Sequence, residues 1–349
     1  MPIKFDAIVI GMGQSGPSLA QRFADQGLRV AVIERKYFGG TCVNTGCMPT
    51  KTLVASAYVA HMARRAKEYG VDVGGPVKVD MKRVKARKDE IVTESRDGVS
   101  DWMEGLANTT VYHGHARFTG PKTVSVNSEV LEADRIVINT GGRAFIPAMP
   151  GVDRVPYLTN STMMELDMLP DHLLIVGGSY IGLEFAQVYR RFGARVTVVE
   201  MADRLIARED PDVSDAVREI LEAEGIEVRL NAKCLAVEKD GDDIVMRLDC
   251  SAGAPSIRGS HLLLAVGRRP NTDELGLDKA GVKVDAKGFI AVDDQCRTNV
   301  PGIWAMGDVN GRGAFTHTSY NDYEIIAANL FEGRARGVGE RIACYGLFI

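Results

Sequence analysis

Residues 8–16 read Ile8-Val9-Ile10-Gly11-Met12-Gly13-Gln14-Ser15-Gly16, an apolar run that leads into three spaced glycines. The apolar run predicts a buried strand, and a helical stretch follows it to residue 27. In such a unit the first glycine makes the tight turn, the second lets the backbone approach a pyrophosphate, and the third lets helix and strand pack closely. A second strand at 29–33 ends at Glu34, a carboxylate suited to bind ribose hydroxyls. The stretch therefore predicts a dinucleotide-binding β-α-β unit.

The same plan recurs later in the chain. A strand at 173–176 leads into Gly177-Gly178-Ser179-Tyr180-Ile181-Gly182, and a strand at 195–199 ends at Glu200. Glu34 follows Gly11 by 23 positions, and Glu200 follows Gly177 by the same number. One glycine motif is weak support, but two in full β-α-β context predict an α/β fold with two Rossmann-like dinucleotide-binding domains. The alternative is a pair of glycine-rich turns that bind no nucleotide. Ser179, in the place of a glycine, makes the second site the weaker of the two.

A third stretch, Gly39-Gly40-Thr41-Cys42-Val43-Asn44-Thr45-Gly46-Cys47-Met48-Pro49-Thr50-Lys51, lies between the two copies. On a regular helix, side chains five residues apart point about 140° away from each other. A disulfide needs Cα atoms within about 7 Å, so a bond between Cys42 and Cys47 requires a local distortion, which Gly46 permits. Pro49 suits the first turn of a helix, where a thiol is biased toward the reactive thiolate. The alternative is two buried structural cysteines.

Two dinucleotide folds together with a cysteine pair favour the redox interpretation. One carrier could hand a hydride to the other, and the second could pass electrons to the cysteines. Flavin is the carrier that joins two-electron hydride chemistry to thiols. The sequence therefore predicts FAD and a nicotinamide nucleotide as cofactors.

The composition excludes several classes of protein. The 349 residues carry a net charge of −4 and 45% of them are apolar, so we expect a large core and no nucleic-acid or acidic-membrane partner. No apolar stretch suits a signal peptide or a membrane-spanning helix, which predicts a cytoplasmic location. No cysteine has zinc-type spacing to another cysteine or to a histidine, and no metal site is predicted.

With these features the chain resembles the class I pyridine nucleotide–disulfide oxidoreductases, which include mercuric reductase and dihydrolipoamide dehydrogenase. The resemblance covers nearly all 349 residues. It rests above all on residues 39–51 and on Met306-Gly307-Asp308, which is similar to the family's second flavin motif. It implies an FAD-binding domain in two segments, 1–146 with the redox dithiol and 271–349, and an NAD(P)-binding domain at 147–270 between them. The C-terminal interface domain, which makes the family's dimer, is expected to be absent.

The resemblance also implies roles for individual residues. Cys42 corresponds to the outer thiol that attacks the substrate, and Cys47 to the thiolate beside the flavin. Lys51 corresponds to a lysine near flavin N5 that pairs with Glu184, and Tyr180 to a tyrosine that covers the nicotinamide pocket. The residues expected to contact the cofactors are, for FAD, Gly11, Gly13, Gly16, Glu34, Arg35, Gly40, Thr41, Lys51, Ala116, Thr140, Gly141, Asp308 and Thr316, and for the nicotinamide nucleotide, Gly177, Ser179, Tyr180, Ile181, Gly182, Glu200 and Gly267.

The activity that the resemblance implies is passage of a hydride from NAD(P)H through FAD to a Cys42–Cys47 disulfide, and on to a disulfide, a metal ion or another small acceptor. NADH is expected to be preferred over NADPH because Glu200 would repel a 2′-phosphate. Two alternatives stay open: an NADH-dependent electron-transfer flavoprotein that reduces quinones, oxygen or dyes, and a cofactor-binding interaction protein without activity. A homodimer is expected only together with the interface domain.

Overall fold

The computed structural model describes residues 1–250 and 253–349, without the side chains of residues 235 and 250. Its contacts divide the chain into two units. The first holds Met1–Asn44, Val92–Arg143 and Arg268–Tyr345, and the second holds Thr45–Ile91, Ala144–Gly267 and Gly346–Ile349. This division groups 45–91 with the inserted segment, whereas the domains expected from the sequence assign it to the FAD-binding segment; those boundaries stay a prediction.

The first unit is built on a seven-stranded sheet in the order β3-β2-β1-β6-β5-β4, with β17 also paired to β6. The strands β1, β2, β3, β6 and β17 pair in parallel, and β4 and β5 pair antiparallel. The strands of the sheet are β1 (Ile3–Ile10), β2 (Val30–Glu34), β3 (Thr109–His113), β4 (Arg117–Gly120), β5 (Thr123–Val126), β6 (Glu129–Ile138) and β17 (Ile303–Ala305). The helices are α1 (Gly16–Asp25), α7 (Leu277–Ala280), α8 (Thr316–Phe331), η4 (Gly307–Asn310) and η5 (Val338–Glu340).

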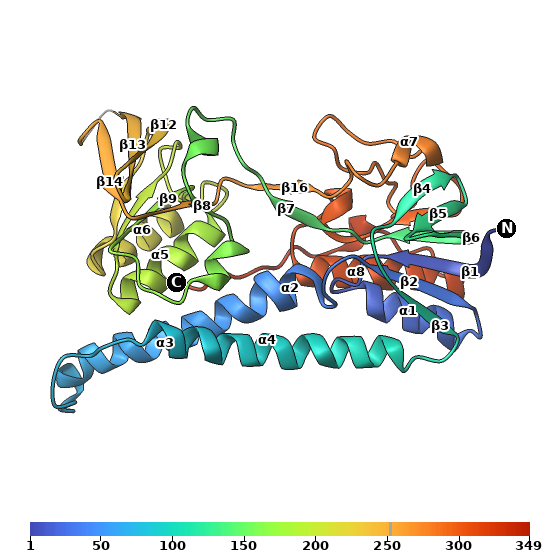
Figure 1. Cartoon of the computed structure of the whole chain (residues 1–349), viewed down its shortest axis with the longest axis horizontal. Helices are drawn as coiled ribbons and strands as arrows, with labels where there is room; N and C mark the ends of the chain where they lie inside the picture. Colours follow the sequence, from blue (N-terminus) through green and yellow to red (C-terminus); the bar gives the residue numbers. More distant parts are fainter. Residues whose placement is uncertain (251–252) are drawn as a thin grey trace. The chain divides into compact units, whose positions relative to one another are not determined.

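Alternating side chains along β1 give the first unit two apolar clusters, one on each face of the sheet. Ala7 and Val9 lie on the face that α1 and α8 cover (Figure 1), where they pack with the fully buried Phe23. Ile8 and Ile10 lie in the cluster on the other face. The buried, parallel central strands explain why the sequence of this region is nearly continuously apolar.

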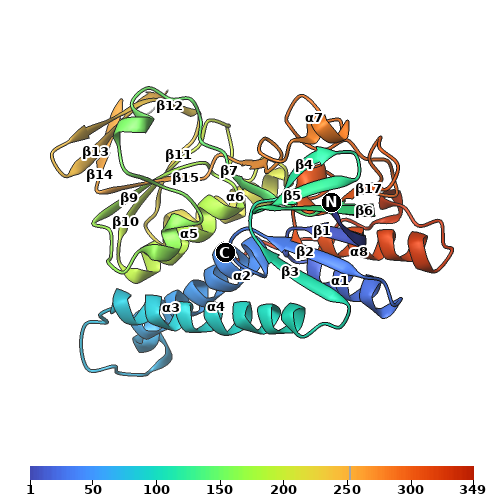
Figure 2. The same ribbon diagram turned by 45° about the vertical axis from the view of Figure 1, so that its right-hand side comes forward.

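The second unit contains a five-stranded parallel sheet, β11-β10-β9-β15-β8, and a three-stranded antiparallel sheet, β12-β13-β14. Figures 1 and 2 both show α5 on one side of the parallel sheet and the antiparallel sheet on the other. The strands are β8 (Tyr157–Leu158), β9 (His172–Val176), β10 (Arg195–Val199), β11 (Glu227–Arg229), β12 (Ala232–Asp240), β13 (Asp243–Cys250), β14 (Ser256–Gly259) and β15 (His261–Leu264). The helices are α3 (Cys47–Arg65), η1 (Ala66–Tyr69), η2 (Val152–Arg154), η3 (Thr162–Glu165), α5 (Tyr180–Phe192) and α6 (Pro211–Ala223).

Four elements reach the boundaries between the units. Helix α2 (Gly40–Thr45) ends one residue past the first boundary, and helix α4 (Met81–Glu104) has residues in both units. Strand β7 (Gly142–Ala144) pairs with β16 (Arg268–Pro270) in a short two-stranded sheet.

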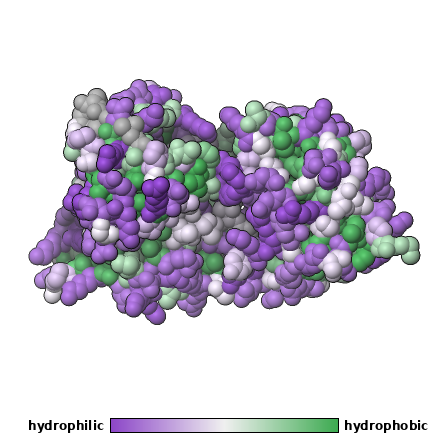
Figure 3. Space-filling view, turned by 45° about the horizontal axis from the view of Figure 1, so that its top comes forward, coloured by the Kyte–Doolittle hydropathy of each residue, from purple (hydrophilic) through white to green (hydrophobic). Residues whose placement is uncertain are grey.

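Polar residues dominate the face of the molecule in Figure 3, and apolar residues are scattered among them in small groups. In the described part of the chain no helix combines the length and the apolar character that crossing a membrane requires.

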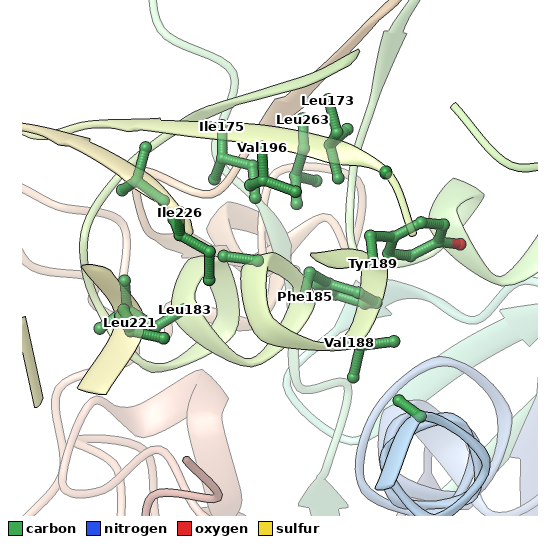
Figure 4. Packing of buried hydrophobic residues seen from close by; sticks show 14 of the residues in the cluster. Leu173, Ile175, Leu183, Phe185, Val188, Tyr189, Val196, Leu221, Ile226 and Leu263 are labelled. Atoms are coloured by element: carbon green, nitrogen blue, oxygen red, sulfur yellow. The ribbon is translucent and has the colours of Figure 1, made fainter. Parts of the chain in front are cut away.

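The core of the second unit lies between the parallel sheet and its helices. Leu173 and Ile175 of β9 point toward α5, where they meet Phe185 and Tyr189 (Figure 4). Leu174, between them in sequence, points to the antiparallel sheet and lies in a separate cluster. The same cluster that packs α5 includes residues of α3, so the helix that begins at Cys47 is fixed against α5 by apolar packing.

Candidate functional site

The loop after β1 has the geometry that a pyrophosphate needs. Gly11 has φ +97°, and a Cβ there would lie 2.4 Å from the carbonyl oxygen of Asn139. A Cβ on Gly16 would lie 2.4 Å from the Gly11 carbonyl oxygen. The nearest atom to a Cβ on Gly13 is Asn139 Nδ2, at 3.6 Å, an ordinary van der Waals distance, so a side chain there would clash with no protein atom. The tight turn falls on the first glycine and the close packing on the third, and the second is the one that the protein itself leaves unobstructed, which is the expected order.

The second copy repeats this arrangement at two of the three positions. A Cβ on Gly177, which has φ +114°, would lie 2.5 Å from the Ala265 carbonyl oxygen, and one on Gly182 would lie 2.2 Å from that of Gly177. Ser179, in the place of the second glycine, has φ −113° and is the N-cap residue of α5. Its conformation needs no glycine, which explains how a serine occupies the place.

The two acidic residues at the strand ends bind the glycine loops in the same way. Glu34 accepts hydrogen bonds from the N–H groups of Met12, at 2.9 Å, and Lys36, at 2.8 Å. Glu200 accepts them from Gly178, at 2.6 Å, and Ala202, at 2.8 Å. The internal repeat is therefore a repeat of hydrogen bonds as well as of sequence.

The two cysteines lie on consecutive helices. Cys42 is in α2 and half-buried, and Cys47 is the first residue of α3 and exposed. The backbone leaves helical geometry between them at Gly46, which has φ −134° and ψ −117°. Pro49 lies in the first turn of α3, as its position in the sequence predicts. The distortion that the five-residue spacing requires is thus located at Gly46.

Lys51 and Glu184 meet in the second unit. Lys51 Nζ donates to both carboxylate oxygens of Glu184, at 2.7 and 2.6 Å, which joins α3 to α5. Glu184 is buried, with 8% of its surface exposed. The Phe348 ring centroid lies 4.1 Å from Lys51 Nζ, and the Phe348 N–H faces a Glu184 oxygen at 3.4 Å. The pairing expected from the resemblance is present.

The Met306–Asp308 segment is held by a buried aspartate that sequence reasoning missed. Asp322 of α8 is 1% exposed and accepts from Gly307 N–H at 2.8 Å and from Asn310 Nδ2 at 2.9 Å. Arg341 pairs with its other oxygen. Burial raises the pKa of the Asp308 carboxyl, and Arg268, with Nε 3.4 Å from Asp308 Oδ2, acts in the opposite direction.

The remaining predicted site residues fall within one unit or the other. In the first unit, two of them bond to other side chains or backbone: Arg35 pairs with Glu274 at 3.1 Å, and Thr140 Oγ1 donates to Asn271 O at 2.9 Å. Gly40 begins α2 and is followed by Thr41, and Thr316 begins α8. Ala116 is buried, and Gly141 has φ +63°. In the second unit, Tyr180 begins α5 and its hydroxyl donates to Glu209, Ile181 is 37% exposed, and Gly267 has φ +132°.

A bound FAD fits these residues of the first unit. A Cβ on Gly13 would clash with no protein atom, and Glu34 stands at the end of the neighbouring strand. Asn44 supplies a further clue: its Oδ1 is buried and lacks a hydrogen-bond partner in the part of the chain that the structure describes. A buried acceptor without a partner is costly unless a ligand or water satisfies it. Asn44 lies within residues 39–51, but no sequence signal separates it from its neighbours.

Comparisons with known proteins agree with this geometry. The family described as pyridine nucleotide-disulphide oxidoreductase matches residues 5–322. A mercuric reductase of Streptomyces lividans is 37% identical over 338 residues, covering 95% of this chain and 71% of that protein. A dihydrolipoyl dehydrogenase of Thermus scotoductus is 35% identical over 328 residues, covering 93% and 70%. The solved Cu(II) complex of the HOCl-induced flavoprotein disulfide reductase RclA from Escherichia coli superposes with a TM-score of 0.88 at 33% identity, covering 97% and 74%.

Proposed function

The chain belongs to the pyridine nucleotide–disulphide oxidoreductase family, and within it we propose an NADH-dependent reductase that acts on small disulfides or soft metal ions through Cys42 and Cys47. Like its relatives it is an FAD-dependent oxidoreductase. FAD, when bound, supplies acceptance of a hydride and transfer of its two electrons to a disulfide.

The first turns of α3 carry the proposal. Cys47 and Lys51 are four residues apart on this helix, so their side chains share a face. A helix N-terminus favours a thiolate. The Glu184 carboxylate fixes the Lys51 ammonium by two hydrogen bonds. This arrangement suits a cysteine that must be a thiolate beside a bound flavin.

The cysteines act in sequence in the proposed reaction. Two electrons and two protons convert the Cys42–Cys47 disulfide to two thiols. The Cys42 thiolate then attacks one sulfur of the acceptor disulfide and forms a mixed disulfide, and the first product leaves as a thiol after taking up a proton. Cys47 attacks Cys42 Sγ, which reforms the internal disulfide and releases the second thiol. The acceptor gains the two electrons that the dithiol loses.

Two groups of the second unit support a preference for NADH. The Glu200 carboxylate is fixed at the end of β10 by two backbone N–H groups, where it would accept a ribose hydroxyl and repel a 2′-phosphate. Arg204, the nearby cation in sequence, donates to the Ala207 carbonyl oxygen at 3.1 Å. Its guanidinium is thus engaged with backbone rather than with Glu200.

Soft metal ions are a second acceptor class that specific observations favour. One relative is named a mercuric reductase, and one similar structure is titled a Cu(II) complex. Thiolates are the ligands that select soft metals. A cysteine pair able to reduce a disulfide could therefore deliver electrons to a thiol-bound metal ion.

The deciding experiment compares acceptors in the wild-type protein and in Cys42→Ser. NADH consumption is measured with a small disulfide, Cu(II), Hg(II), a quinone and oxygen. We expect Cys42→Ser to lower the disulfide and metal rates by about 10³-fold or more and to leave the quinone rate within about twofold. Cys344→Ser, which alters an exposed cysteine outside the redox stretch, is the matched control. Equal disulfide rates with and without Cys42 would favour the electron-transfer flavoprotein instead.

A further inference from the structure

We infer that Asn139 is a positioning residue for the flavin nucleotide. Its side chain joins the glycine loop after β1 to the Met306–Asp308 loop, so that the two loops hold their geometry together. The inference rests on the FAD dependence of the family and not on the nucleotide or acceptor proposed above.

One end of the Asn139 side chain supports the glycine loop. Asn139 directly follows β6, and its backbone N–H donates to Ile10 O at 2.7 Å. Its side-chain Nδ2 donates to the Gly11 carbonyl oxygen at 3.0 Å. The same nitrogen lies 3.6 Å from the position of a Cβ on Gly13 and 3.0 Å from that on Gly16. The amide nitrogen is therefore bonded to Gly11 and lies where side chains on Gly13 and Gly16 would point.

The other end of the side chain begins a chain of hydroxyl groups. Ser15 Oγ lies 3.1 Å from Asn139 Oδ1 and 2.7 Å from Ser319 Oγ. Because an amide oxygen only accepts, Ser15 donates its one hydrogen to Asn139 and accepts from Ser319. Hydrogen bonds thus run in one direction from Ser319 on α8, through Ser15 and Asn139, to the Gly11 carbonyl. Ser15, Asn139 and Ser319 are 0%, 6% and 8% exposed, so water does not compete for these bonds.

The Met306–Asp308 loop rests on the same polar groups. Gly307 has φ +74°, and a Cβ there would lie 2.6 Å from Ser319 Oγ and 3.4 Å from Asn139 Oδ1. The backbone beside Asp308 therefore packs directly on the network. A substitution at Asn139 would therefore alter the geometry of both loops that are expected to hold FAD.

The second dinucleotide copy shows that the fold does not need this amide. Ala265 occupies the position in the second copy that Asn139 occupies in the first. Its N–H donates to Val176 O at 2.8 Å, and its carbonyl lies against Gly177. Ile181 stands where Ser15 stands in the first copy. The β-α-β unit thus forms with apolar side chains at both places, and the Asn139–Ser15 pair is an addition specific to the expected flavin site.

The test measures FAD binding and the stability of the apoprotein separately. For Asn139→Ala we expect the FAD dissociation constant to rise about tenfold, with the thermal midpoint of the apoprotein within about 3 °C of wild type. Asn329→Ala is the matched control, because Asn329 Nδ2 also donates to backbone carbonyls of the first unit, at 2.8 Å to Ile325 and to Arg336. We expect it to leave FAD affinity within about twofold.

Asn139→Asp gives a signature that a general loss of stability would not produce. A carboxylate facing the Gly11 carbonyl oxygen places two acceptors in contact, so FAD should bind at least about tenfold more weakly than in wild type near pH 8. On protonation the carboxyl can donate to Gly11, and the ratio to wild type should fall about fivefold or more on going to about pH 5.5.

Two outcomes in the Asn139 variants would overturn the inference. One is an FAD affinity in Asn139→Ala that equals that of wild type, or that is lower only in proportion to a lower thermal midpoint of the apoprotein. The other is a pH-independent affinity ratio for Asn139→Asp. If Asn139→Ala does not fold, Ser15→Ala removes only the middle hydroxyl and should still weaken FAD binding about threefold, and no change in that variant would equally reject the role. Failure of the wild-type protein to bind FAD at all would instead reject the family's cofactor for this chain.

Discussion

Lys51 on α3 donates hydrogen bonds to both carboxylate oxygens of Glu184 on α5, at 2.7 and 2.6 Å. The two side chains are 34% and 10% exposed, so the pair lies partly outside water. Lys51→Met would leave the Glu184 carboxylate without its cation. We expect the free energy of unfolding to fall by about 1–2 kcal/mol, less than for a fully buried pair because Lys51 is a third exposed.

The same substitution should slow the reaction. We expect NADH-driven reduction of the bound flavin to fall about tenfold or more in Lys51→Met, measured by rapid mixing, because the family resemblance implies that this ammonium lies near flavin N5 and its charge is then lost. Lys51→Arg keeps the charge and should lose less. Equal rates in the two variants would show that the ammonium charge has no part in the step.

Substitutions at Gly13 and Gly16 should have different effects, one on cofactor binding and the other on folding. A Cβ on Gly16 collides with the Gly11 backbone, so Gly16→Ala should destabilise the apoprotein by about 1–3 kcal/mol. A Cβ on Gly13 meets no atom closer than 3.6 Å. Gly13→Ala should therefore keep the apoprotein midpoint within about 3 °C and weaken FAD binding at least about tenfold. Thermal unfolding and a fluorescence titration check both, and normal FAD affinity in Gly13→Ala would contradict the assignment.

Glu200 should decide between the two nicotinamide nucleotides. In Glu200→Gln the negative charge facing a 2′-phosphate is removed, and we expect the ratio of kcat/KM for NADH to that for NADPH to fall about tenfold or more. Glu222→Gln makes the same change on the exposed face of α6 and serves as the control. An unchanged ratio in Glu200→Gln would remove this residue from nucleotide selection.

His172 should make stability depend on pH. Its ring lies between Arg258 O and Thr197 Oγ1, at 2.8 Å from each. Burial lowers the pKa of His172 below 6.5, and Arg195 acts in the same direction, while Glu227 and Asp243 act against it.

The unfolded chain therefore binds the His172 proton at a higher pH than the folded chain does. The contribution of the neutral His172 ring to the free energy of unfolding is present above pH 6.5. It is lost as the pH falls below that value toward the pKa of His172 in the folded chain. Chemical unfolding should show that wild type loses more of its free energy of unfolding than His172→Gln does between about pH 7 and 5. Parallel pH profiles for the two proteins would contradict this.

Short sequence motifs were enough to predict a large part of the candidate site. The three glycines, the two strand-end carboxylates and the place of Pro49 in the first turn of a helix could be predicted because each is a short-range pattern with one physical cause. The Lys51–Glu184 contact joins residues 133 positions apart, and only the family resemblance pointed to it.

Other parts of the site could not be predicted. Asp322 and Ser319 lie among polar residues of α8, and nothing in the local pattern shows that they turn inward to hold a distant loop. Asn139 follows an ordinary apolar strand, and its importance depends on contacts with residues 124 and 128 positions away. Such contacts belong to the tertiary fold, which periodicity and propensity do not encode.

The interleaving of the two units has a consequence for synthesis. The chain passes between the units five times, and β6 of the first unit pairs with β17, Ile136 opposite Ile303. Because the ribosome delivers the chain from its N-terminus, strand β6 emerges well before its partner β17. The long segment Ala144–Gly267 is complete by then, and it carries the parallel strands of the second unit. The second unit can therefore form most of its sheet during translation, while the first unit waits with an open strand edge at β6 that nascent-chain chaperones would have to shield.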